Sequence, residues 1–141
     1  MNGVIAVSHA SLASGVYSAV KMIAGEFENV RIVEFKENDP LDGFDEKIKE
    51  AYKSLEAYKN VIILADLAGG TPFNRSVMSL GDKENVRVIG GLNFASLYQA
   101  INSDGDDIDL SIKEILEIGK ESLIAYEAKI NDDSNEDTDG I

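Results

Sequence analysis

Hydrophobic residues occur along this chain in two kinds of short segment. Four runs are rich in β-branched residues and bounded by turn residues, which is typical of buried strands. They span residues 4–7, 30–35, 61–65 and 86–89. Between and after these runs, apolar side chains recur at the spacing of amphipathic helices. This spacing predicts helices within residues 12–23, 44–58, 73–80, 97–101 and 112–123.

The alternation of strands and helices predicts an α/β fold with a doubly wound, mainly parallel sheet. The economical arrangement is a flavodoxin-like topology with strand order 2-1-3-4, and residues 125–130 are a candidate edge strand. In such sheets, ligands bind at the carboxyl ends of the strands where the order reverses, here between strands 1 and 3. We expect one domain over residues 1–130.

Composition and charge exclude several classes of protein. The chain has 26 acidic and 13 basic residues, and its net charge of −13 would repel nucleic acid. Five of the acids lie in residues 131–141, "NDDSNEDTDGI", which predicts a disordered acidic tail. Cysteine is absent, so there is no thiolate nucleophile or thiolate metal site. We expect neither a signal peptide nor a membrane-spanning helix.

A histidine and an aspartate follow neighbouring strands of the predicted sheet. His9, the only histidine, ends the first strand, and Asp66 ends the third. A carboxylate bound to one ring N–H fixes the imidazole tautomer and leaves the other nitrogen as a nucleophile near neutral pH. The pair therefore predicts a histidine that accepts and passes on a phosphoryl group. A single histidine cannot form a multi-histidine metal site, and nucleotide-binding loops are lacking, so we expect no metal or cofactor.

The segment after Asp66 predicts a place for an anion. Its two glycines allow close approach of the backbone, and Thr71 and Pro72 predict the N-cap and first residue of a helix. Free N–H groups at such a helix start bind anions. Each feature also has a plainer interpretation: a surface histidine, a loop carboxylate, a helix start and, at Asn93, a helix cap.

Three stretches resemble the IIA component of the mannose-type sugar phosphotransferase system. They are "DLAGGTPFN" (residues 66–74), "VSHAS" at the end of the first strand and "GGLNFASL" after the fourth. The resemblance extends to about residue 128 and implies that His9 is phosphorylated, that Asp66 orients it and that the Gly70–Thr71 turn lies near the phosphoryl oxygens. The sequence departs from the family at Ala10, where many members have glycine, at Ala68, where many have a bulky residue, and at residues 94–95, where proline is common.

The resemblance also implies a set of partners. It implies a cytoplasmic homodimer that exchanges an edge strand, accepts a phosphoryl group from the phosphocarrier protein HPr and passes it to a histidine of a IIB component. IIB then phosphorylates a sugar that the membrane components IIC and IID bring in, so the membrane is involved only indirectly. The predicted catalytic residues are His9 and Asp66; the predicted phosphoryl-binding residues are Gly70, Thr71, Ala10 and Ser11; the predicted supporting residues are Gly69, Pro72 and Asn93.

Three alternatives remain open at this point. A related domain forms the phosphoryl-donor subunit of dihydroxyacetone kinase, although the full "GGTPFN" stretch argues against it. A non-catalytic module could bind a small anion in the same crevice without using His9. A regulatory docking domain is the third alternative, since similar domains occur in transcription regulators.

Overall fold

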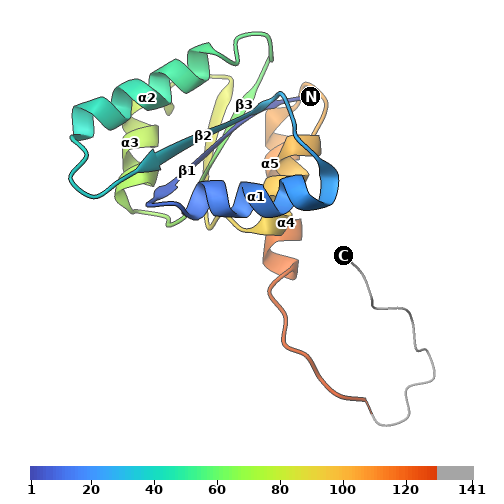
Figure 1. Ribbon diagram of the computed structural model, residues 1–141. Helices are drawn as coiled ribbons and strands as arrows, with labels where there is room; N and C mark the ends of the chain where they lie inside the picture. Colours follow the sequence, from blue (N-terminus) through green and yellow to red (C-terminus); the bar gives the residue numbers. More distant parts are fainter. Residues whose placement is uncertain (130–141) are drawn as a thin grey trace.

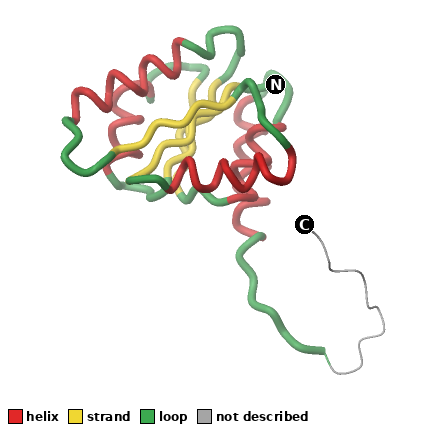
Figure 2. Tube along the Cα trace, viewed as in Figure 1, coloured by secondary structure: helices red, strands yellow, loops and turns green. Residues whose placement is uncertain are grey.

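A four-stranded parallel sheet lies at the centre of the computed structural model, which describes residues 1–129 (Figures 1 and 2). The strands are β1 (Gly3–His9), β2 (Val30–Phe35), β3 (Val61–Ala65) and β4 (Val86–Gly90). Their order is β2-β1-β3-β4, and all three pairs are parallel. The predicted fold class and strand order are confirmed.

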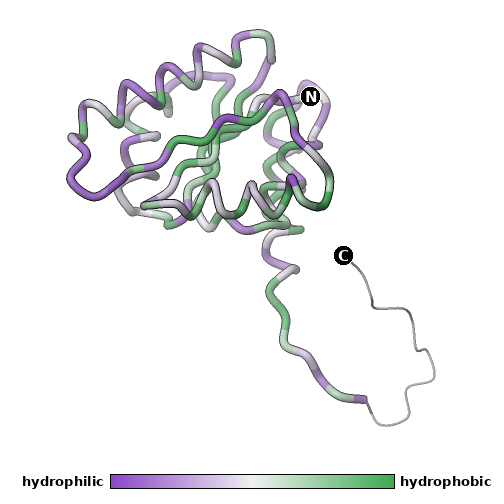
Figure 3. The backbone as a smooth tube through the Cα atoms, in the orientation of Figure 1, coloured by the Kyte–Doolittle hydropathy of each residue, from purple (hydrophilic) through white to green (hydrophobic). Residues whose placement is uncertain are grey.

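Helices cover both faces of the sheet. They are α1 (Leu12–Ala24), α2 (Leu41–Lys53), α3 (Thr71–Leu80), α4 (Phe94–Asn102) and α5 (Ile108–Glu121). Val4 and Ala6 face one core with α1, α4 and α5, while Ile5 and Val7 face a second core with α2 and α3. Because β1 and β3 are buried on both faces, their sequences contain unbroken apolar runs. Figure 3 shows this as hydrophobic strands surrounded by helices of mixed character.

Two helix boundaries differ most from the prediction. The second predicted helix ends at Lys53, and turns follow it, although Leu55 is fully buried and continues the helical spacing. The last helix begins earlier than predicted, at Ile108. Its start is fixed by Asp107, whose side chain accepts hydrogen bonds from the amides of Asp109 and Leu110. An acidic residue thus caps the helix, where the sequence suggested a loop.

Residues 125–129, the described part of the edge strand predicted over residues 125–130, pair with no strand in the single chain. Residues 123–129 form no strand and run away from the body of the protein (Figure 1). Leu123, Ile124 and Tyr126 in this segment are each more than four-fifths exposed. Residue 130 and the predicted acidic tail, residues 131–141, lie outside the described residues. None of the helices within residues 1–129 combines the length and apolar character that crossing a bilayer requires.

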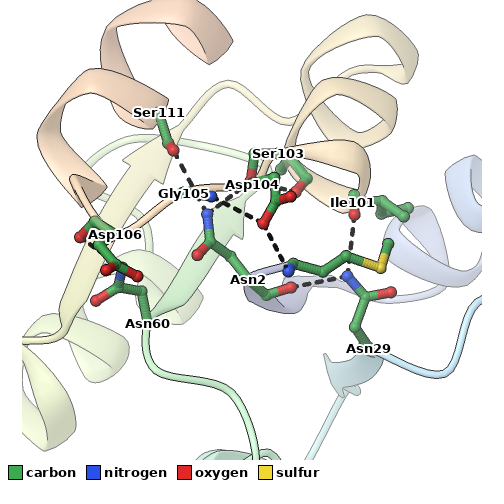
Figure 4. A network of polar contacts seen from close by, with 11 residues as sticks. Asn2, Asn29, Asn60, Ile101, Ser103, Asp104, Gly105, Asp106 and Ser111 are labelled. Atoms are coloured by element: carbon green, nitrogen blue, oxygen red, sulfur yellow. Dashed lines mark hydrogen bonds and ion pairs between the residues drawn. The ribbon is translucent and has the colours of Figure 1, made fainter.

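Buried asparagines tie the amino ends of the strands to the α4–α5 connection (Figure 4). The side-chain amide of Asn29, 2% exposed, donates to the carbonyls of Asn2 (2.7 Å) and Ile101 (3.0 Å). The amide of Asn2 donates to the Ser103 hydroxyl at 2.8 Å. Buried polar groups are normally paired, and these bonds pair them. They join the amino ends of β1 and β2 to the end of α4. The candidate catalytic residues, His9 and Asp66, lie at the opposite, carboxyl end of the sheet.

The same four residues, "ENVR", lead into both edge strands, as residues 28–31 and 84–87. In β2, the Arg31 guanidinium donates to the carbonyls of Glu28 and Val30. In β4, the Arg87 guanidinium donates to the equivalent carbonyls of Glu84 and Val86. An edge strand exposes unpaired backbone groups, and each arginine covers some of them where its strand begins.

Candidate active site

His9 and Asp66 lie in direct contact at the carboxyl ends of β1 and β3. Oδ2 of Asp66 lies 2.9 Å from His9 Nδ1 and also accepts the backbone N–H of His9 at 3.0 Å. The pairing of β1 with β3 sets this contact, since Val7 is opposite Ala65 and the amide of Asp66 donates to the Val7 carbonyl. The structure therefore brings together the two residues that the sequence placed at the switch point.

This contact determines which ring nitrogen is free. An ionised carboxylate is only an acceptor, so the proton of the neutral ring is held on Nδ1. Nε2 has no hydrogen-bond partner within residues 1–129 and carries the lone pair. The His9 side chain is 46% exposed, whereas that of Asp66 is only 9% exposed. A buried carboxylate thus holds an accessible nucleophile in one tautomer.

Gly70 leaves room for the imidazole. A Cβ built at Gly70 would lie 2.9 Å from Cε1 of His9, closer than real contacts allow. The backbone of Gly70 has φ −79°, so the site needs glycine here for space. Gly69 has φ +84° and is needed for conformation instead. The two adjacent glycines therefore have different roles.

The first residues of α3 have free backbone amides beside this ring. The N-cap of the helix lies one residue earlier than predicted. Gly70 is the N-cap, so Thr71 is the first helical residue and Pro72 the second, and the Thr71 side chain makes no cap bond. The first helical hydrogen bond runs from the amide of Asn74 to the Gly70 carbonyl. Within residues 1–129 this leaves the amides of Thr71 and Phe73 without a partner. Such free amides bind anions.

Ala10 follows His9 in a left-handed conformation, with φ +49°. Its amide donates to the Phe35 carbonyl at 2.9 Å, and its carbonyl accepts from the Ser8 hydroxyl. The same hydroxyl accepts the amide of Ala13 at 2.8 Å. These bonds hold a turn that glycine would adopt with less strain.

Glu34 and Lys36, at the end of β2, join the same edge of the sheet, and the sequence analysis missed both. Glu34 accepts the Ser14 amide in the first turn of α1 at 2.8 Å. Lys36 Nζ lies 3.1 Å from Glu34 Oε1 and 3.1 Å from the Ser11 hydroxyl. Burial raises the pKa of Glu34 most, but the bonds from Ser14 and Lys36 outweigh it and leave the pKa lowered. The missed signal was that Lys36 is the only base in the four connections after the strands.

Asn93 is a helix cap in this structure. Its Oδ1 accepts the amide of Ser96 at 2.8 Å, and the Ser96 hydroxyl accepts the amide of Asn93 at 3.0 Å. The remaining amide group of Asn93 donates to the Gly119 carbonyl on α5. These bonds form a capping box that joins α4 to α5. The polar groups of Asn93 are therefore used within the fold.

Small residues allow the β3–α3 and β4–α4 connections to touch. A Cβ at Gly90 would lie 2.6 Å from the Cβ of Ala68. This contact accounts for the small residue at position 68. Beside it lies an apolar groove of about 670 Å³ between the β4–α4 connection and α5, lined by Phe94, Leu116 and Leu123 among others. His9 is not among its lining residues.

The described part of the chain offers no cluster for a metal ion. No three His, Cys, Asp or Glu side chains within residues 1–129 gather closely enough to ligate one. The His9 site itself presents an imidazole, a carboxylate, free amides and a hydroxyl.

Comparison with known proteins gives matches over most of the chain. The family described as "PTS system fructose IIA component" (EIIA-man) matches residues 3–118. The mannose-specific EIIAB component of Escherichia coli is 31% identical over 86% of this chain, which spans only 38% of that protein. The sorbose-specific EIIA component of Lacticaseibacillus casei is 27% identical, with 95% and 97% of the two chains covered.

A solved structure supports the same conclusion. The mannose/sorbose-specific IIA subunit from Enterococcus faecalis is 30% identical and superposes with a TM-score of 0.81 over 92% of this chain and 97% of that one. Fold, family match and sequence identity agree along the length that carries His9, Asp66 and the glycine turn. This chain therefore belongs to the EIIA-man family, the IIA components of the sugar phosphotransferase system.

Proposed function

We propose that this protein is a cytoplasmic phosphocarrier that accepts a phosphoryl group from phospho-HPr on Nε2 of His9 and passes it to a histidine of a IIB component. The contact that carries the proposal is the 2.9 Å approach of Asp66 Oδ2 to His9 Nδ1. It leaves Nε2 as the nucleophile on a half-exposed ring. A non-catalytic anion-binding module would need the free amides of α3 but not this contact.

The proposed chemistry is an exchange between two nitrogen atoms. The Nε2 lone pair attacks the phosphorus of the donor's phosphohistidine, and an N–P bond forms as the donor's N–P bond breaks. The electron pair of the broken bond returns to the donor nitrogen. The proton on Nδ1 stays in place, and the Asp66 carboxylate offsets the positive charge on the ring. Transfer to IIB repeats the exchange with His9 as the donor.

The surroundings of His9 suit a protein partner. Leu12, at the start of α1, and Leu67, next to Asp66, are 48% and 58% exposed. Apolar side chains beside a half-exposed imidazole are typical of a surface that another protein covers. The family match and the full "GGTPFN" stretch favour HPr and IIB as these partners over the components of dihydroxyacetone kinase.

We further propose a homodimer in which each chain adds its C-terminal segment to the other. β4 is an edge strand, so part of its backbone has no strand partner in the single chain. The exposed residues Leu123, Ile124 and Tyr126 lie in a segment that extends from the end of the apolar groove. A second copy would bury these side chains, and two-fold dimers are the commonest closed assembly.

The first prediction tests the phosphorylated residue. Incubated with phosphoenolpyruvate, enzyme I and HPr, the protein should gain one phosphoryl group that is labile in acid and stable in alkali. His9→Ala should gain none, because it lacks the nucleophile while keeping the backbone N–H that Asp66 binds. Mass spectrometry measures the gain, and circular dichroism checks the fold. Labelling of the His9→Ala protein would refute the assignment.

The second prediction concerns Asp66. In Asp66→Asn, the amide can donate to Nδ1 and favour the tautomer with the proton on Nε2. We expect transfer from phospho-HPr to slow about 100-fold, or roughly 2.7 kcal/mol of activation free energy. Rapid-quench kinetics measure the rate. Asp82→Asn, an exposed site after α3, is the control. Wild-type speed in a folded Asp66→Asn protein would mean that Asp66 only stabilises its loop.

The third prediction compares two glycine-to-alanine substitutions. Gly70→Ala should displace the His9 ring and slow transfer by about 10- to 100-fold, because small misplacements of a reacting group are costly. In Gly15→Ala the new methyl group meets open space within α1, so it should leave transfer unchanged and stabilise the protein by about 0.5–1 kcal/mol. Transfer rates and urea unfolding measure both effects. Equal rates in the two variants would contradict the packing role of Gly70.

The fourth prediction concerns the dimer. A chain that ends at Ser122 should be a monomer, because it lacks the exposed apolar residues 123–126. A chain that ends at residue 130 lacks only the acidic tail and should remain a dimer. Light scattering at micromolar concentration gives the mass of each. A monomeric full-length protein, or a dimer that survives both truncations, would refute the strand exchange.

A further inference from the structure

We infer that Lys36 is a positioning residue that stabilises the phosphorylated state of His9 through the hydroxyl of Ser11. This inference rests on the proposed function, and it adds a residue from the β2–α2 connection to a site otherwise built at the ends of β1 and β3. Three observations carry it: the distribution of charge at the carboxyl edge of the sheet, the contacts of Lys36, and the unused proton of Ser11.

The carboxyl edge of the sheet carries little positive charge. Among the four connections that follow the strands, only the β2–α2 connection contains a base, Lys36. Arg75, one turn into α3, is paired with Asp45 on α2. The phosphoryl group would add negative charge beside the Asp66 carboxylate, in a protein whose net charge is −13. A nearby cation would offset this repulsion.

The contacts of Lys36 hold its ammonium in place. Nζ lies 3.1 Å from Glu34 Oε1, and the other oxygen of Glu34 accepts the Ser14 amide at 2.8 Å. The Glu34 side chain is only 12% exposed, whereas that of Lys36 is 50% exposed. The carboxylate thus points into the protein, and the ammonium remains accessible on the surface beside Ser11.

Ser11 connects this ammonium to the histidine loop. Its hydroxyl oxygen accepts from Lys36 Nζ at 3.1 Å, two residues after His9. Ser11 is the N-cap residue of α1, yet its side chain makes no cap bond, because Glu34 takes the Ser14 amide instead. A hydroxyl that accepts from an ammonium points its own proton away from it. Within residues 1–129 this proton has no acceptor, so it is available to a phosphoryl oxygen.

A measurement of equilibrium separates this role from two simpler ones. If Lys36 only docked the donor protein, its loss would slow transfer in both directions equally and leave the equilibrium constant unchanged. If it only stabilised the fold through Glu34, its loss would lower the melting temperature and leave the phosphoryl distribution unchanged. Only a residue that favours the phosphorylated protein shifts the equilibrium between phospho-HPr and this protein.

The experiment mixes phospho-HPr with the full-length protein and measures the final distribution of phosphoryl groups by ³¹P NMR. Lys36→Met should shift the equilibrium toward phospho-HPr by about tenfold, the size expected for one bond to a charged group. Lys36→Arg should restore most of the shift. Lys49→Met is the matched control, since Lys49 is 52% exposed and paired with Glu46 on α2. It should behave as the wild type.

A second experiment tests whether Lys36 acts through the Ser11 hydroxyl. Ser11→Ala should give a shift similar to that of Lys36→Met, and the double variant should give no more than either single one. Additive shifts would overturn the role of Ser11 as the link. An unchanged equilibrium in a folded Lys36→Met protein would overturn the inference, even if transfer were slower. A wild-type protein that takes no phosphoryl group would refute the proposed function itself, so the two failures are distinguishable.

Discussion

The register between β1 and β3 is the constraint on which the candidate site depends. Val7 pairs with Ala65, so His9, two residues further along β1, and Asp66, the residue after β3, lie at the same edge of the sheet and within hydrogen-bond distance. Successive side chains of a strand point to opposite faces, so a slip of one residue would move the imidazole away from the carboxylate. It would also exchange the two sets of apolar residues between the two cores. The packing energy of both cores therefore maintains the position of the ring.

Most of the fold could be predicted because its signals are local. The four strands are short β-branched runs between turn residues, and the parallel arrangement follows from their alternation with helices. The two wrong helix boundaries lie where the same sequence pattern is compatible with two local structures. Leu55 continues the spacing of a helix, but it lies in a turn and is buried there. Asp107 lies in a stretch typical of a solvated loop, but it caps a helix. The C-terminal segment is a different case, because residues 123–129 pair with no strand in the single chain.

The site was predictable as far as its residues follow neighbouring strands directly. His9 ends β1 and Asp66 follows β3, so their positions at one edge of the sheet could be predicted. The free amides of α3 could be predicted because its first residues are typical of a helix start. The contact between Lys36 and Ser11 does not, because it depends on the course of two loops and on a carboxylate that replaces the usual cap of α1. The roles of Gly70 and Ala68 were hidden for a similar reason. Each is defined by a neighbour in space, His9 for one and Gly90 for the other.

The left-handed turn at Ala10 has a consequence for the entropy of the loop beside the histidine. A non-glycine residue at φ +49° costs about 1 kcal/mol of backbone strain in the folded protein. Alanine also samples fewer conformations than glycine in the unfolded chain, so folding loses less entropy at this position. Once folded, the same methyl group excludes the extended conformations with positive φ that a glycine could visit. Alanine in place of glycine thus restricts the backbone next to the imidazole to fewer conformations, at the cost of this strain.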